Sequence, residues 1–138
     1  MLIDAHCHLD FADFDHDREA MFERAREAGV EHFMVPGTTR AYWPRVLALG
    51  AARDDVSISL GLHPGFMDEH GEEDIEALAR ALDEHPEVRA LGECGIDARF
   101  EETLEAQWAL FDAQLRLAKA RQLPVVIHCV HANDKVSK

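Results

Sequence analysis

Short β-type runs alternate with stretches of helical periodicity along this chain, and that order leaves few folds open. Strands are predicted at residues 2–5, 32–36, 57–61, 88–92 and 125–128. Helices are predicted between them, near residues 17–28, 42–53, 75–84 and 103–122. Strand–helix–strand units with short connections form parallel sheets with right-handed crossovers. The sequence therefore predicts an α/β fold with five strands and four helices.

The helical stretch at residues 103–122 has the clearest periodicity. Its apolar side chains recur at four- and three-residue steps, at Leu104, Trp108, Phe111, Leu115 and Ala118. This spacing places side chains on one face of a helix, so we expect these five to pack against the sheet.

The composition indicates one globular domain of 138 residues, with a net charge of 14 − 27 = −13. Such an acidic chain is unsuited to holding nucleic acid on a broad basic face, although it can meet phosphates through bound metal ions. No apolar run approaches the ~18 residues of a transmembrane helix. We therefore expect no membrane span. A cytoplasmic location is expected from the cysteines, because three cysteines without a CxxC motif suit a reducing compartment.

The three cysteines form no CxxC motif, so no disulfide framework is expected. Each follows a polar residue at the end of a predicted strand, at Cys7, Cys94 and Cys129. Strand alternation turns them towards the helices. We expect them to pack there as small apolar side chains rather than to bind metal.

The first predicted strand carries Asp4, His6 and His8 on one face, because alternate residues of a strand point the same way. Two imidazoles at a strand end can bind one cation from the same side. A carboxylate behind them can orient a ring by accepting its second N–H. The other interpretation is a pair of surface histidines at a strand end.

Further residues of this kind stand at the ends of the other strands. His63 follows the third strand, Glu93 ends the fourth with Asp97 just beyond it, and His128 ends the fifth. Parallel strands bring their carboxyl ends to one face, so these residues are predicted to converge. A carboxylate can bridge two divalent ions while imidazoles complete their coordination. The alternative is that they gather there by chance.

The chain also contains, in order, the segments "IDAHCHLD", "VPGT", "GLHP", "GECGID" and "QLRLAKARQLPVVIHCVHANDKV". With these motifs it resembles the TatD-type metal-dependent hydrolases and deoxyribonucleases of the amidohydrolase superfamily, over essentially its whole length. The resemblance implies a (β/α)8 TIM barrel. Residues 1–138 would be the N-terminal portion of that single barrel domain, an incomplete barrel with about the first five strands and four helices.

The resemblance implies a site for two divalent metal ions in the intact fold, with Zn, Mn, Ni or Mg as candidates. It places His6 and His8 on one ion, Glu93 between the two, and His128 on the second. In this chain, one ion or none is the alternative.

The resemblance also assigns supporting and catalytic roles. His63 is expected to face a substrate phosphate or a metal-bound water, so His63 and Glu93 are the expected catalytic residues. Asp4 and Asp97 are expected to support the ligands from behind.

Three features depart from the family pattern. Strands six to eight are absent, and with them a further histidine ligand and an aspartate that acts as general base. Val130 stands where an arginine is usual, and Ala98 and Arg99 replace an aromatic pair. An open five-stranded sheet exposes two edges and an apolar face. We expect the rest of a longer polypeptide, a second copy or a complementary fragment to cover it, or the last elements to rearrange.

The function implied by the resemblance is hydrolysis of DNA phosphodiester bonds by a metal-activated water. DNA is the expected partner, and no membrane partner is expected. One alternative is a hydrolase of small cyclic amides, esters or lactones. Glu93 argues against superfamily members built around a carbamylated lysine at the end of the fourth strand. A third interpretation is an inactive metal-binding or assembly fragment.

Overall fold

The computed structural model describes residues 2–4, 8 and 15–131, with the backbone alone for residues 2–4. The strands are β1 (Leu2–Asp4), β2 (Val30–Pro36), β3 (Val56–Leu60), β4 (Ala90–Asp97) and β5 (Val125–Val130). The α-helices are α1 (Arg18–Glu27), α2 (Trp43–Ala52), α3 (Asp74–Glu84) and α4 (Leu104–Arg121). Short 3-10 helices precede the last three, namely η2 (Arg40–Tyr42), η3 (Pro64–Glu69) and η4 (Glu101–Thr103).

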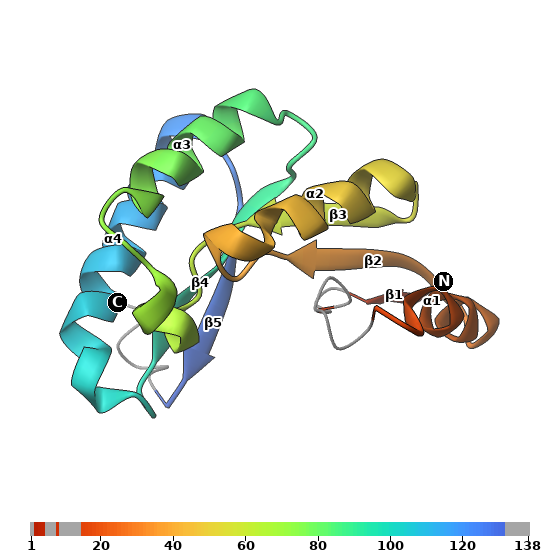
Figure 1. Cartoon of the computed structure of the whole chain (residues 1–138), viewed down its shortest axis with the longest axis horizontal. Helices are drawn as coiled ribbons and strands as arrows, with labels where there is room; N and C mark the ends of the chain where they lie inside the picture. Colours follow the sequence, from red (N-terminus) through yellow and green to blue (C-terminus); the bar gives the residue numbers. More distant parts are fainter. Residues whose placement is uncertain (1, 5–7, 9–14, 132–138) are drawn as a thin grey trace.

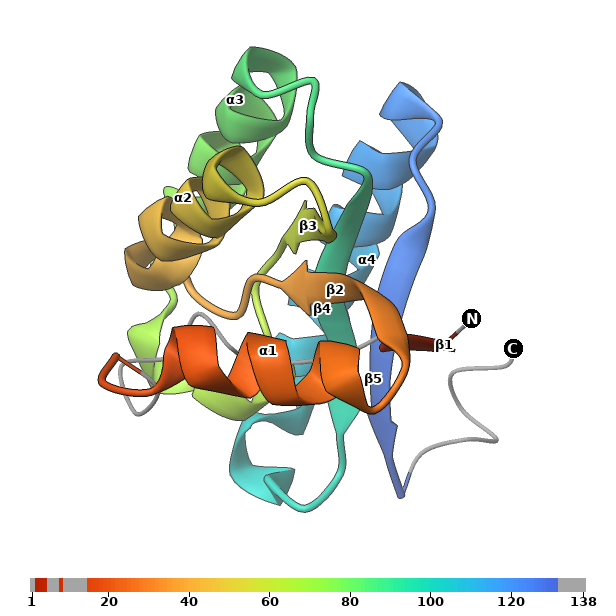
Figure 2. The same ribbon diagram turned by 90° about the vertical axis from the view of Figure 1, so that its right-hand side faces the viewer.

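The strands form one parallel sheet in the order β1-β2-β3-β4-β5. In Figure 1 the strands run through the middle of the molecule, with α2, α3 and α4 outside them. Helix α2 packs against β3, and α4 packs against β4. Figure 2 shows β4 and β5 side by side in front of α4. The α/β class and the parallel sheet are confirmed, and the arrangement is consistent with part of a TIM barrel.

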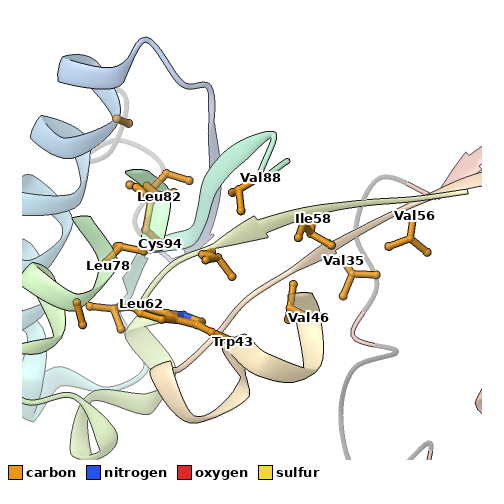
Figure 3. Close-up of a cluster of buried hydrophobic side chains, with 14 of the residues drawn as sticks. Val35, Trp43, Val46, Val56, Ile58, Leu62, Leu78, Leu82, Val88 and Cys94 are labelled. Atoms are coloured by element: carbon orange, nitrogen blue, oxygen red, sulfur yellow. The ribbon is translucent and has the colours of Figure 1, made fainter. Parts of the chain in front are cut away.

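The hydrophobic core lies between the sheet and the helices (Figure 3). Val35 and Ile58 contribute from the strands, and Val46 and Leu78 contribute from the helices. Burial of such side chains is the main favourable term of folding, at about 25 cal/mol per Å² of apolar surface. Cys94 is fully buried in this core, and Cys129 packs against it, as expected. Cys7 lies outside the described residues.

The ends of the last two strands differ from the prediction. Glu93 lies inside β4 rather than at its end, Asp97 is its last residue, and β5 continues past His128. Gly92 and Gly95 lie within this longer strand. Gly95 has a φ of 140°, and a Cβ on it would overlap the carbonyl oxygen of His128. Glycine therefore allows β4 and β5 to run together beyond the expected end.

The packed face of α4 contains the five apolar residues expected from the sequence. Phe111 and Ala118 are buried, and Leu104, Trp108 and Leu115 are partly buried and pack against the core. Gln107 and Gln114, which were not expected there, are also buried. The two glutamines take core positions because their amides bond to main-chain groups, as described below.

The described sheet leaves β1 and β5 as its two edge strands. Ile127 on β5 is 44% exposed, which is unusual for a strand residue of its size. This agrees with the expected open side of the sheet. Among the described residues, no helix combines the length and the apolar content that a bilayer crossing requires.

Candidate functional site

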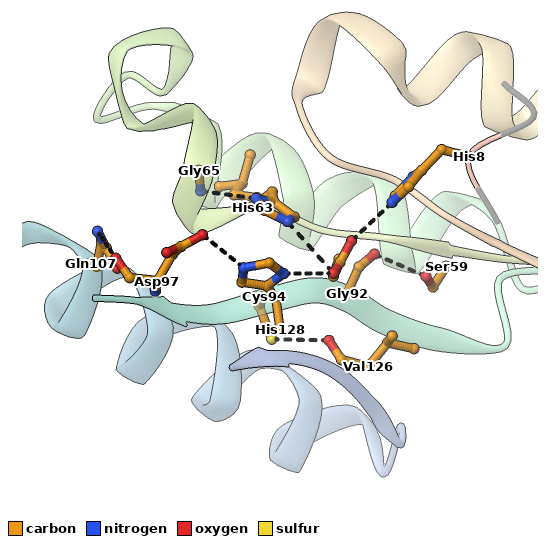
Figure 4. Close-up of polar contacts among 12 residues, drawn as sticks. His8, Ser59, His63, Gly65, Gly92, Cys94, Asp97, Gln107, Val126 and His128 are labelled. Atoms are coloured by element: carbon orange, nitrogen blue, oxygen red, sulfur yellow. Dashed lines mark hydrogen bonds and ion pairs between the residues drawn. The ribbon is translucent and has the colours of Figure 1, made fainter. Parts of the chain in front are cut away.

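The carboxylate of Glu93 lies among three histidines from separate parts of the chain (Figure 4). Its side chain is only 3% exposed, and Oε1 lies 3.3 Å from Nε2 of His8. Its other oxygen, Oε2, lies 3.1 Å from Nδ1 of His128 and 3.5 Å from Nε2 of His63. The histidines come from the segment after β1, from the loop after β3 and from β5. The parallel topology therefore brings these distant residues together.

Main-chain hydrogen bonds hold the ends of the central strands in place. The Glu93 N–H donates to the carbonyl of Gly37, and the His63 N–H donates to that of Thr38, both at 2.8 Å. The hydroxyl of Ser59 donates to the carbonyl of Gly92 at 2.9 Å. The loop after β2 thus fixes the main chain of both Glu93 and His63.

His128 lies between two carboxylates. Its Nδ1 faces Glu93, and its Nε2 lies 3.0 Å from Oδ2 of Asp97. The hydrogen bond with Glu93 and then that with Asp97 raise the pKa of His128, although burial opposes the shift. Hydrogen bonds from Arg99 chiefly lower the pKa of Asp97, with a further contribution from His128 and against the effect of burial. The site therefore favours a charged His128 when no cation is present.

The pKa of Glu93 reflects two opposing effects. Burial is the largest single influence and raises it, but the hydrogen bonds from His128, His63 and His8 together outweigh burial. The pKa of Glu93 consequently lies well below its ordinary value. A buried carboxylate stays ionised when hydrogen-bond donors compensate for its lost hydration, and here those donors come from imidazole rings.

His63 is held in one tautomer by its own loop. The N–H of Gly65 donates to His63 Nδ1 at 2.8 Å, so a neutral ring carries its proton on Nε2. Nε2 of His70 lies 2.8 Å from the His63 carbonyl and further fixes this loop. A proton on Nε2 suits His63 to donate a hydrogen bond into the site, rather than to coordinate a metal ion.

The donor set fits a divalent cation. Possible ligand atoms of His63, Glu93 and His128 all lie within 4.8 Å of one another, and of these three the proton on Nε2 makes His63 a hydrogen-bond donor beside the ion rather than a ligand. Imidazole nitrogens with a carboxylate suit Zn, Mn and Ni well, and Mg less well. The contact from His128 to Asp97 is the outer support that metal-bound histidines usually have. Glu93 and His128 are therefore the best-placed ligands, with His8 on the other carboxylate oxygen.

The structure brings together five of the residues singled out from the sequence, namely His8, His63, Glu93, Asp97 and His128. His6 lies outside the described residues. Only the backbone of Asp4 is described, in β1. The assignment of each residue as ligand, catalytic group or support stays a prediction.

Two glutamines of α4, which were not predicted as site residues, bond to the main chain next to the site. Gln114 accepts from the N–H of Leu62 at 2.9 Å and donates to its carbonyl at 3.1 Å. Gln107 does the same for Asp97, at 2.8 and 3.1 Å. They stand seven residues apart on α4, two turns along one face. Polar residues at core spacing on a helix are the signal that identifies them.

Comparisons with known proteins agree with this picture. The family described as TatD related DNase matches residues 3–138. The metal-dependent hydrolase YjjV of Escherichia coli K12 is 42% identical over 98% of this chain and 53% of its own length. A 3′-5′ ssDNA/RNA exonuclease TatD of Cronobacter turicensis is 37% identical over 97% of this chain and 51% of its own length.

The same relationship holds in three dimensions. The crystal structure of the TatD homologue YjjV from Escherichia coli superposes with a TM-score of 0.93 and 41% sequence identity. The superposition covers 99% of this chain and 53% of that one. The chain thus spans about half the length of the relatives it matches.

Proposed function

Because the chain belongs to the TatD-related DNase family, we propose that it supplies the metal-binding part of a hydrolase that cleaves DNA phosphodiester bonds. The observation that carries the proposal is the buried, ionised Glu93, surrounded by imidazoles from three segments. A family relative named as a 3′-5′ ssDNA/RNA exonuclease supports a nucleic acid substrate.

The two oxygens of Glu93 face different partners, and this supports a pair of ions. Oε1 faces His8 and Oε2 faces His128, so one carboxylate can serve two coordination sites. In the proposal, His8 and His6 would hold one ion, and His128 would hold the other. When bound, such ions lower the pKa of water and neutralise charge on a phosphate under attack.

The chain's own residues have separate tasks in this proposal. Asp97 accepts from Nε2 of His128 and keeps its Nδ1 turned towards Glu93. His63 presents its Nε2 proton towards the space beside Glu93, where it can donate to a phosphate oxygen. Glu93 remains ionised because its pKa is lowered, so it is ready to bind cations at neutral pH.

We place residues 1–138 as the N-terminal portion of a single (β/α)8 domain. The edge strand β5 with its exposed Ile127 supports this, as does the match to about half of each relative. Closing the barrel leaves no sheet edge. The remaining strands, or a second chain that replaces them, would cover this side.

A second candidate function is metal binding without cleavage. It is favoured by the span of the match, because the chain aligns with only 53% of the YjjV hydrolase. Residues that complete catalysis in such relatives can lie in the other half.

The test is a cleavage assay on the purified chain with Mn²⁺ and a 5′-labelled single-stranded oligonucleotide. We expect shortened products that disappear in Glu93→Gln and His128→Ala and persist in His85→Ala, which alters a histidine outside the cluster. Mn²⁺ binding without products would favour the second candidate. A wild-type chain that neither binds Mn²⁺ nor cleaves would contradict both.

A further inference from the structure

Phe100 presents a large aromatic ring to solvent next to the candidate metal site. It is 45% exposed, and of the large hydrophobic residues in the described part of the chain only Ile127 is comparably exposed. Its main chain is firmly anchored: the N–H donates to Asp97 at 3.1 Å, and the carbonyl accepts from Gln107 and Thr103 at 3.2 Å. The main chain that carries the ring is therefore fixed by hydrogen bonds.

The ring of Phe100 forms one wall of a groove of about 360 Å³. The other lining residues are Pro64, Gly65, Met67, Asp68, Glu102 and Thr103. A Cβ on Gly65 would come within 3.1 Å of the His63 ring and 3.8 Å of Phe100. Glycine keeps the space between these two rings open, so the groove adjoins the cluster around Glu93. Its volume is at the lower end of the range for small-molecule sites, roughly 300–1,000 Å³.

Arg99 places a cation beside both Asp97 and the ring of Phe100. Its Nε and Nη2 donate to Asp97 at 2.9 and 2.6 Å, and its side chain is 56% exposed. The guanidinium carbon lies 5.8 Å from the centre of the Phe100 ring. A guanidinium carries five N–H donors, so donors remain for a phosphate after Asp97 has bonded.

The distribution of charge indicates which part of a nucleotide fits where. Asp68 and Glu102 line the groove and disfavour a phosphate inside it. An uncharged nucleobase carries no such penalty, and it can stack on the ring of Phe100. The phosphate then lies on the side of Arg99, towards Asp97 and the metal cluster. Because the chain has a net charge of −13, stacking has to contribute much of the affinity that a basic surface would otherwise supply.

From this arrangement we propose that Phe100 and Arg99 form a nucleotide subsite, in which the ring of Phe100 stacks a nucleobase and Arg99 pairs with the adjoining phosphate. The inference rests on the proposed function and extends it. It makes Phe100 and Arg99 determinants of nucleic acid binding, and it distinguishes a nucleotide substrate from a phosphodiester without a base.

The test measures fluorescence anisotropy of a labelled single-stranded hexanucleotide and of a matched one whose 3′-terminal residue lacks its base. The wild-type chain should bind the complete oligonucleotide about tenfold more tightly. Phe100→Ala should abolish this preference, and Phe100→Tyr should retain it. Arg99→Ala should lower the affinity for both oligonucleotides by a similar factor. Ile127→Ala removes the other exposed apolar side chain and should change neither affinity.

An unchanged preference in Phe100→Ala, or an equal loss of affinity for both oligonucleotides in that variant, would overturn the inference. Circular dichroism checks that each variant is folded. Hydrolysis of bis(p-nitrophenyl) phosphate, which has no base, separates this question from the proposed function. If the wild-type chain fails to hydrolyse it, the proposed hydrolytic function is wrong. The binding preference for the complete oligonucleotide still shows whether Phe100 and Arg99 form a nucleotide subsite.

Discussion

Nδ1 of His128 lies 3.1 Å from Oε2 of Glu93, although 35 positions separate the two residues in the sequence. Each partner shifts the pKa of the other towards its charged form. This ion pair exists only when Glu93 has lost its proton and His128 has gained one, so its contribution to stability depends on pH. A cation that replaces the proton between them would use the same nitrogen and oxygen.

In chelator-treated protein, this pair should make the free energy of unfolding depend on pH in both directions. The pKa of Glu93 is lowered, so its contribution is complete above the ordinary value of 4.5 and is lost as pH falls through the folded-state pKa. The pKa of His128 is raised, so its contribution is complete below 6.5 and is lost as pH rises through the folded-state pKa. Urea unfolding should show the pair's greatest contribution between these two values.

Comparison with variants isolates the contribution of the pair. His128→Asn removes the titrating ring, so the decline that His128 causes on the alkaline side should disappear. His85→Asn should keep the wild-type profile, because the ring of His85 lies outside the cluster and faces the exposed side chain of Glu87. If the free energy of unfolding of His128→Asn still fell at alkaline pH as in the wild type, groups other than His128 would be responsible for that fall.

Replacing Gln114 by alanine should destabilise the protein by about 3 kcal/mol, because it leaves the N–H and carbonyl of Leu62 buried without their partner. Arg116→Ala on the same helix is the control. Its side chain is 81% exposed, so its effect should stay within about 0.5 kcal/mol. Equal midpoints for the two variants in urea unfolding would refute the role given to Gln114.

Gly61 allows β3 to approach β4 closely. A Cβ at this position would lie 2.6 Å from the carbonyl carbon of Gly92, the residue before Glu93. Gly61→Ala should therefore cost about 2 kcal/mol and weaken cation binding. At Gly71 the nearest atoms, at 3.5 Å and beyond, belong to the Glu73 side chain, so Gly71→Ala should change thermal stability little. Similar losses in both variants would show that the contact with Gly92 is unimportant.

The thiol of Cys94 should be inert in the folded protein. Burial, with a smaller effect of the Glu93 charge, raises its pKa from 9.0 to about 12. At pH 8 the thiolate fraction of Cys94 is therefore roughly a thousandth of the fraction in a cysteine with the ordinary pKa, and only the thiolate is alkylated readily. Iodoacetamide labelling with peptide mass spectrometry should find Cys94 unmodified until the protein is unfolded. Rapid labelling of this residue in the folded protein would contradict its packing role.

The order of the elements and the convergence of the site could be predicted from the sequence. Alternating periodicities located the strands and helices, and the parallel topology required His63, Glu93 and His128 to meet on one face. That inference needs only the position of each residue near the end of its strand. The prediction that these residues converge therefore holds even when the strand boundaries are wrong by a few residues.

The finer details depend on tertiary contacts that local patterns do not reveal. The sequence predicts a strand that ends at residue 92, but the pairing with β5 carries β4 on to Asp97. The spacing of Gln107 and Gln114 indicates that they share a face of α4, but only the folded chain shows that they bond to the main chain of Asp97 and Leu62. The role of Gly65, which keeps the space open between His63 and Phe100, likewise appears only in the folded chain.

The most direct test is isothermal titration of the chelator-treated chain with Mn²⁺ and Zn²⁺. We expect saturable binding that Glu93→Gln and His128→Ala each weaken at least tenfold, whereas His85→Ala leaves it unchanged. Binding that is absent in the wild-type chain, or that survives intact in Glu93→Gln, would contradict the assignment of this cluster as a metal site.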